Sequence, residues 1–191
     1  ILGTTIDDAV GEAFDKVAKM MGLGYPGGPL IDKYAKNGDV NFHKFPIAQL
    51  KNTKYNFSFS GLKTSVLYFL KEIEFEMNRS EELISNIAAS FQHTAVETLF
   101  QKVKKAVKEF NVDFVTVSGG VSANSYLKKM FNELQNHKVK VFIPEIVYST
   151  DNAAMIGITA YLKYITSENK DFFLKESLSV KARPRLDYKI L

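Results

Sequence analysis

The spacing of the apolar residues changes abruptly near residue 111, and this change limits the folds open to the chain. Before it, apolar residues recur at helical spacing over residues 80–110, which predicts one long helix. After it come two short β-branched runs, at 114–117 and 139–143, each followed by a helical pattern. The second half therefore predicts strand, helix, strand, helix, with the two strands parallel in an α/β layer. Because two strands do not make a stable sheet alone, we expect other protein to complete it.

The first half is predicted to be mainly helical. Thr5 is placed to cap a first helix that ends in a left-handed turn at Gly22. The next segment, GLGYPGGP, predicts a loop, after which Pro29 suits the first position of a short helix. Residues 37–56 read as loop, and Ser60 is placed to cap a third helix. One face of the first helix is apolar and comprises Val10, Ala13, Phe14, Val17 and Met21.

The composition excludes several classes of protein. The 191 residues are 46% hydrophobic and 24% charged, as in a packed globule and unlike a disordered chain. No apolar run approaches membrane-spanning length, so we expect no membrane association. Cysteine is absent, which excludes disulfides, thiolate metal sites and a cysteine nucleophile. The net charge of +4 allows an anionic partner without requiring one.

The amino end predicts a cytoplasmic protein. Ile1 leads directly into the first helix signal, without a basic leader and a short apolar core. We therefore expect no signal peptide, and we expect the sequence to have been cut from a longer one.

A glycine turn after the first predicted strand is the first candidate site. Residues 118–124 read SGGVSAN, so that a strand ends, the backbone turns at two glycines and a helix begins. Free amides at such a helix start attract anions, and Asn124 offers both a donor and an acceptor. A simple strand-to-helix connection would give the same pattern.

Two groups of carboxylates are further candidates. Asp151 lies in the segment STDN, at the carboxyl end of the second strand, where α/β folds bind ligands and where a carboxylate can hold a metal. Taken alone, this segment is explained more simply as an ordinary helix cap. Asp15 belongs to a polar stripe before the glycine loop and, with Asp32, could bind sugar hydroxyls of a nucleotide. A solvated helix face is the alternative.

The remaining catalytic patterns are missing from the sequence. His43, His93 and His137 are not four residues apart in any pair, so no helical two-histidine metal motif exists, and His93 reads as structural. There is no G-x-S-x-G segment of a serine hydrolase. No catalytic residue is assigned.

Five segments together resemble one family. GEAFDKVAK, GYPGGPLID, FSFSGLKT, SGGVSAN and STDNAAMIG occur in this order in the TsaD family, also called YgjD or Gcp. These proteins are tRNA threonylcarbamoyladenosine synthases, formerly described as O-sialoglycoprotein endopeptidases. The resemblance covers essentially the whole chain.

The resemblance implies a fold, a reaction and a set of site residues. It implies the actin-like and sugar-kinase-like ATPase fold, related to RNase H, with two lobes around a nucleotide cleft. It implies transfer of a threonylcarbamoyl group from threonylcarbamoyl-adenylate to an adenosine beside the tRNA anticodon, with partner proteins of the same pathway. The implied metal is iron(II) or zinc, held by two histidines and Asp151. The implied adenylate contacts are Asp15, Gly28, Asp32 and Asn124.

The chain also departs from this family at its amino end. The first lobe, the two metal histidines and an S-G-G-H-T hairpin have no counterpart, so the chain is expected to be an incomplete, helix-rich second lobe. We expect residues 1–110 to be a helical, substrate-contacting segment and residues 111–191 to be the strand-helix-strand-helix core. We expect the chain alone to be inactive and to self-associate through unpaired strand edges.

Three functions remain open from the sequence. The first is the lobe of a tRNA-modifying enzyme, and the second is a non-catalytic paralogue or scaffold of the same complex. A metalloprotease is the third, and it is disfavoured because the chain has no metal histidine pair.

Overall fold

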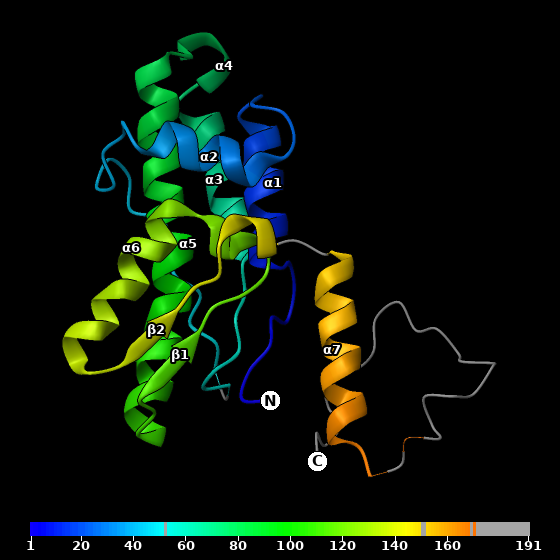
Figure 1. The fold of residues 1–191 in the computed structure, drawn as a ribbon. Helices are drawn as coiled ribbons and strands as arrows, with labels where there is room; N and C mark the ends of the chain where they lie inside the picture. The colour runs from blue at the N-terminus through cyan, green and yellow to red at the C-terminus, as the bar shows by residue number, and fades with distance from the viewer. Residues whose placement is uncertain (52, 150–151, 169, 171–191) are drawn as a thin grey trace. The chain divides into compact units, whose positions relative to one another are not determined.

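Helices dominate the part of the chain that the computed structural model describes, which is residues 1–51, 53–149, 152–168 and 170 (Figure 1). These residues fall into two compact units, of which the larger is Leu2–Ser149. Its elements follow the predicted order. They are α1 (Val10–Met20), α2 (Gly27–Ala35), α3 (Ser60–Glu72), α4 (Phe75–Asn78), α5 (Glu81–Phe110), β1 (Phe114–Thr116), the 3-10 helix η1 (Gly120–Ala123), α6 (Ser125–Asn132), η2 (Glu133–His137), β2 (Lys140–Phe142) and η3 (Ile146–Tyr148).

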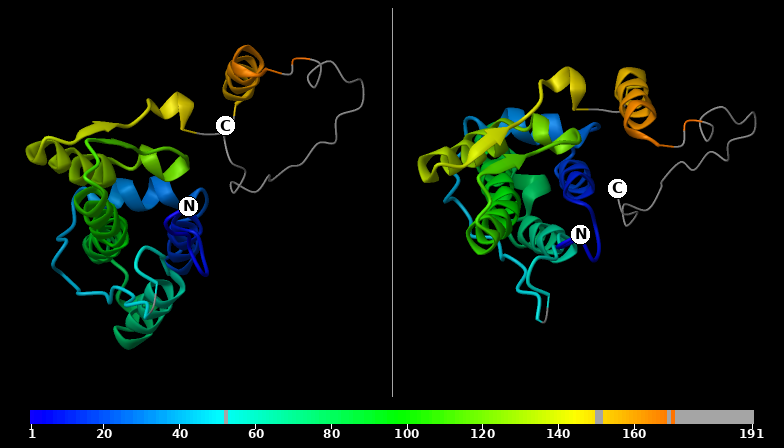
Figure 2. Two further views of the ribbon diagram at one scale, coloured as in Figure 1. Left: turned by 90° about the horizontal axis from the view of Figure 1, so that it is seen from below. Right: turned by 60° about the horizontal axis from the view of Figure 1, so that its bottom comes forward.

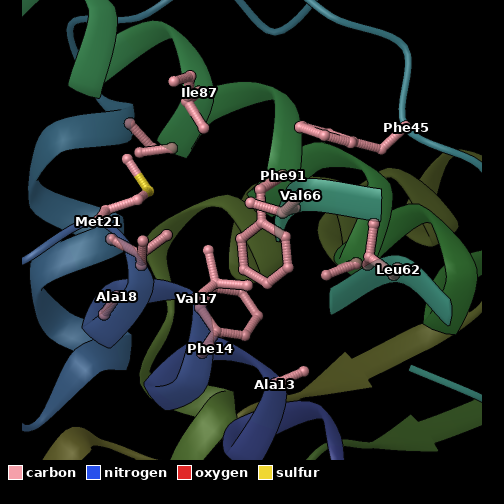
Figure 3. Packing of buried hydrophobic residues seen from close by; sticks show 14 of the residues in the cluster. Ala13, Phe14, Val17, Ala18, Met21, Phe45, Leu62, Val66, Ile87 and Phe91 are labelled. Carbon is pink, nitrogen blue, oxygen red and sulfur yellow. The ribbon is translucent and has the colours of Figure 1, made fainter. Parts of the chain in front are cut away.

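The first core lies where α1, α2, α3 and α5 meet. Phe14 of α1 and Phe91 of α5 meet edge to face with ring centroids 5.0 Å apart, and the smaller Ala18 and Val66 lie nearby (Figure 3). All four side chains are buried. The apolar spacing of the sequence thus predicts the buried face of α1 correctly.

Helix α5 is shared by both halves of this unit. Ser80 caps its start by accepting a hydrogen bond from the Leu83 amide, and Asn111 ends it in a left-handed conformation. Thirty residues give a helix about 45 Å long. Its first turns pack in the first core, whereas Val96 and Phe100 belong to a second core with α6.

The two strands form a small parallel sheet, as predicted. Val115 pairs with Val141, and both side chains pack against the second core. Figure 2 shows the strands and α6 on one side of α5, with α3 on the other. The outward-facing Phe114 and Phe142 are 50% and 57% exposed. Within the described residues this sheet has no third strand.

Four local predictions are corrected by the structure. Thr5 does not cap α1, because its backbone forms a bridge with Phe57, and the N-cap is Ala9. Ser60 lies inside α3 rather than before it. Asp7 takes the capping role, since its Oδ1 accepts from the amides of Phe59 and Ser60 at 2.8 and 3.3 Å.

The other two corrections concern helix boundaries. α2 begins at Gly27, two residues before Pro29, because an aspartate from α1 caps these earlier amides. The helical pattern that follows the first strand in the sequence is divided in the structure into η1, α6 and η2. Asn124 is extended, with φ −61° and ψ 128°, and so begins a new helix instead of lying within the first turn.

The second unit contains α7 (Ala153–Thr166), which matches the helical pattern predicted after the second strand. Asn152 caps it by accepting from the Met155 amide at 2.8 Å. None of the helices in the described residues is long and apolar enough to cross a membrane. The division of the chain at residues 110 and 111 stays a prediction.

Candidate functional site

Asp15 projects from α1 to the amino end of α2. Its Oδ1 accepts a 2.8 Å hydrogen bond from the Gly27 amide and a longer one, 3.4 Å, from the Gly28 amide. The N-cap of α2 is Pro26, which supplies no side-chain acceptor. A carboxylate from a neighbouring helix therefore satisfies the free amides, at the positive end of the α2 dipole.

Gly27 allows this contact because α1 and α2 touch at this point. A Cβ on Gly27 would lie 2.6 Å from Ala18 Cβ and 2.7 Å from Asp15 Cα. No larger residue fits without moving one helix. The residues predicted from the sequence include Gly28 but not Gly27, although two adjacent glycines are a signal of close approach between backbones.

Gly28 differs from its neighbour because the space beside it is open. No atom lies within 4 Å of the position that a Cβ would occupy, and the residue is partly exposed. The protein itself does not require glycine here. A ligand that approaches the backbone amide closely would require it.

Asp32 repeats the arrangement one helical turn further along α2. Its Oδ1 accepts from the Ser125 amide at 3.1 Å and from the Ser125 hydroxyl at 2.8 Å. Ser125 is the first residue of α6, so Asp32 caps α6 just as Asp15 caps α2. Sequence analysis missed Ser125.

Asn124 is the N-cap of α6 and is nearly buried. Its Oδ1 accepts from the Leu127 amide at 2.9 Å, and its Nδ2 donates to Gln92 Oε1 of α5 at 2.7 Å. Gln92 was also missed. It lies four residues after Ala88 and three before Ala95, both buried, and a polar residue in that register is a signal of a buried contact.

The structure thus connects four of the predicted site residues. Asp15 contacts Gly28 directly, α2 carries both Gly28 and Asp32, and Asp32 contacts the residue that follows Asn124. The order of contact is α1, α2, α6 and α5. Their role in ligand binding stays a prediction.

The glycine turn lies beside α1. Gly119 has φ +90° and ψ 171°, a conformation open in practice only to glycine. A Cβ on Gly11 of α1 would lie 3.3 Å from Val121. The buried Ser122 donates to the buried Ser149 at 3.1 Å, and so fixes the turn to the end of η3.

An open groove of about 670 Å³ runs along α1 to the glycine-rich loop that joins α1 to α2. Of the predicted site residues only Asp15 lines it, together with Lys16, Lys19 and Tyr25. Its size is in the range of small-molecule sites. One oxygen of Asp15 holds α2, and within the described residues no hydrogen bond uses the other, Oδ2.

Two further aspartates fix the start of α1 next to α3. Asp8 accepts from Lys16 at 2.8 Å and from Lys63 at 2.6 Å, and these hydrogen bonds lower the pKa of Asp8 to about 2. Burial raises the pKa of Asp7, but hydrogen bonds from Ser58 and from two amides outweigh it and leave the pKa lowered. Lys16 also pairs with Glu12 at 2.8 Å, so its charge is shared by two carboxylates.

The predicted metal ligand Asp151 lies outside the described residues. Among the residues that the structure describes, no group of three or more His, Asp or Glu side chains is arranged to hold a metal ion. The described residues therefore do not make a site for iron or zinc. His93 instead pairs with Tyr126, at 2.8 Å between Nδ1 and the hydroxyl oxygen.

Comparison with known proteins identifies the family. The family model for tRNA N6-adenosine threonylcarbamoyltransferase, TsaD, matches residues 1–158. A protein of that name from Thermosipho africanus is 49% identical over 176 residues, covering 92% of this chain and 52% of the relative. Another from Christiangramia forsetii is 50% identical over 174 residues, or 90% of this chain and 51% of the relative.

The chain belongs to the TsaD family. This membership implies an actin-like fold, with which the helix-rich α/β structure and its small parallel sheet agree. The chain spans about half the length of the curated relatives it matches.

Proposed function

We propose that this chain is the nucleotide-binding second lobe of a tRNA threonylcarbamoyladenosine synthase. One observation carries the proposal. The Asp15 carboxylate caps α2, which bears Gly28 and Asp32, and the Asp32 carboxylate caps α6, which begins next to Asn124. The resemblance implies Asp15, Gly28, Asp32 and Asn124 as adenylate contacts. A connected set of hydrogen bonds at these four positions supports that assignment.

Each residue has a distinct part in the proposed site. One oxygen of Asp15 and one of Asp32 each bind the start of a helix, and the second oxygen of each is the proposed acceptor for ribose hydroxyls. Gly28 lets the ligand approach the α2 amides, and Asn124 donates from Nδ2. These contacts hold the adenylate in place, so their contribution to the reaction is orientation of the substrate.

In the proposed reaction the exocyclic amine of a tRNA adenosine attacks the carbamoyl carbon of threonylcarbamoyl-adenylate. A carbon–nitrogen bond forms, the bond from that carbon to the phosphate oxygen breaks, AMP leaves and the amine loses a proton. Iron(II) or zinc, held partly by Asp151, belongs to the proposal for the whole protein, as do tRNA and partner proteins. Because the first lobe and the two metal histidines of the family have no counterpart in this sequence, we expect no transfer by this chain alone. We place its action in the cytoplasm.

Binding of AMP to the 191-residue chain tests the nucleotide site. Asp15→Asn keeps an oxygen to cap α2 but removes the charge and replaces one acceptor with a donor, so we expect AMP to bind at least tenfold more weakly by calorimetry. Asp113→Asn is the control, because Asp113 is exposed and its side chain makes no hydrogen bond among the described residues. Equal affinity of wild type and Asp15→Asn would remove Asp15 from the site.

The outer face of the β1–β2 sheet favours a second candidate, a binding module that associates with protein. Phe114 and Phe142 lie on the same exposed face, and strand edges with no partner in the described residues can recruit another chain. We propose that the chain self-associates here. Light scattering at about 50 μM should give a dimer or larger species that Phe142→Lys converts to monomer. A monomeric wild type would contradict this.

A further inference from the structure

We propose that Gln92 of α5 is a positioning residue that sets the side chain of Asn124 for the nucleotide. The inference rests on the proposed nucleotide site and adds a residue that the motif segments do not contain. The two side chains are joined by a 2.7 Å hydrogen bond across 32 positions of the sequence.

The hydrogen bonds of Asn124 leave it one orientation. Its Oδ1 must face the Leu127 amide to cap α6, and its Nδ2 must face an acceptor, which Gln92 Oε1 supplies. Rotating the amide by half a turn would bring a donor to the Leu127 amide and an acceptor to the Gln92 oxygen. Both contacts would be lost. Asn124 therefore keeps one N–H for a ligand, and the ligand atom that it meets must be an acceptor.

Burial makes this arrangement firm. Gln92 is 4% exposed and Asn124 is 8% exposed, so neither lost hydrogen bond would be replaced freely by water. Gln92 comes from the 30-residue helix α5, between Phe91 and Ala95 of the first core. The acceptor that orients Asn124 is thus held by a helix that packs in both cores.

The contact with Asn124 accounts for a glutamine at this position. Within the described residues no hydrogen bond uses Gln92 Nε2. The Gln92 side chain contacts Asn124 through its acceptor, Oε1. An apolar residue of similar length would fill the same buried space without an amide to satisfy. The polar group is explained by what it does to Asn124.

A double-mutant cycle with AMP as the probe tests the proposal. Gln92→Met keeps the side-chain length and removes the acceptor. Asn124→Ser keeps a helix-capping oxygen and removes Nδ2. We expect each single variant to bind AMP about tenfold more weakly, and the double variant to be no weaker than the weaker single one. The side-chain NH₂ signals of Asn124 in a ¹⁵N spectrum should shift in Gln92→Met before any ligand is added.

Thr98→Val is the matched control. Thr98 is a buried polar residue on the same helix, and its hydroxyl donates only to Thr94 O of that helix. The control should keep the AMP affinity of the wild type.

Three outcomes would overturn the proposal. Additive losses, to about a hundredfold in the double variant, would make Gln92 independent of Asn124. Unchanged affinity in Gln92→Met would remove its role, and an equal loss in Thr98→Val would make that role merely structural. A wild type that binds no AMP would instead refute the proposed nucleotide site itself, and with it any part of Gln92 in binding.

Discussion

The crossing of α1 and α2 and the β1–β2 layer bury their apolar faces to different extents. At the crossing, each helix packs on two others, Phe14 and Ala18 are fully enclosed, and Asp15 satisfies the free amides of α2. In the sheet only the inner face is covered, and Phe114 and Phe142 face outward. Both regions use α5 as their support.

The difference between the crossing and the sheet bears on how the candidate site residues are held in place. Asp15 and Gly28 lie on the two crossing helices, whereas Asn124 lies on the segment that joins the sheet to α6. Asp32 and Gln92 connect that segment back to α2 and α5. The segment between the sheet and α6 is thus fixed by polar contacts with the helical part of the unit.

The largest expected effect separates two phenylalanines. Phe14→Ala removes a buried ring from the first core and should cost about 3–5 kcal/mol of unfolding free energy. Phe142→Ala should change it by less than about 1 kcal/mol, because that ring is largely exposed. Urea unfolding followed by circular dichroism measures both. Similar losses in the two variants would mean that another chain covers the sheet in solution.

Two adjacent glycines provide a sharper comparison. Gly27→Ala should destabilise the chain by about 2–4 kcal/mol, because the new methyl group meets Ala18 and displaces the amide from Asp15. Gly28→Ala should leave stability within about 1 kcal/mol and can raise it, since alanine favours a helix. Urea unfolding of both variants measures this difference in stability. If AMP binding also survives Gly28→Ala, then no ligand approaches that amide closely.

The smallest effect concerns acid stability at the start of α1. The pKa of Asp8 falls from 3.8 to about 2 through its hydrogen bonds with Lys16 and Lys63. Because the folded pKa is lowered, the stabilisation is present above pH 4 and is lost as the pH falls toward 2, by about 1 kcal/mol.

Lys63→Met tests this assignment. It should raise the pKa of Asp8 and move that loss of stability nearer pH 4, as thermal unfolding measured from pH 2 to 6 would detect. Lys71→Met, an exposed change on the same helix, is the control. Identical pH profiles for the two variants would show that Lys63 does not stabilise the Asp8 carboxylate.

Periodicity predicted the helices and the parallel strands because it reports which residues are buried along one element. It placed Phe14 and Phe91 in the core and paired the runs around Val115 and Val141. It failed at helix starts, where Asp7 and Asp15 act as caps from 52 and 12 positions away. A carboxylate that caps a distant helix has no local signal. The register of Gln92 between Ala88 and Ala95 indicates burial, but the partner of Gln92 is brought to it only by the fold.

The central claim is that the capped amino ends of α2 and α6 form one nucleotide site. A ¹⁵N amide titration of the 191-residue chain with AMP tests it most directly. We expect saturable shifts at the amides of Gly28 and Ser125 and at the side chain of Asn124, with a single dissociation constant. Shifts absent from these groups, or confined to the apolar groove around Leu67, Phe75 and Met77, would contradict the account.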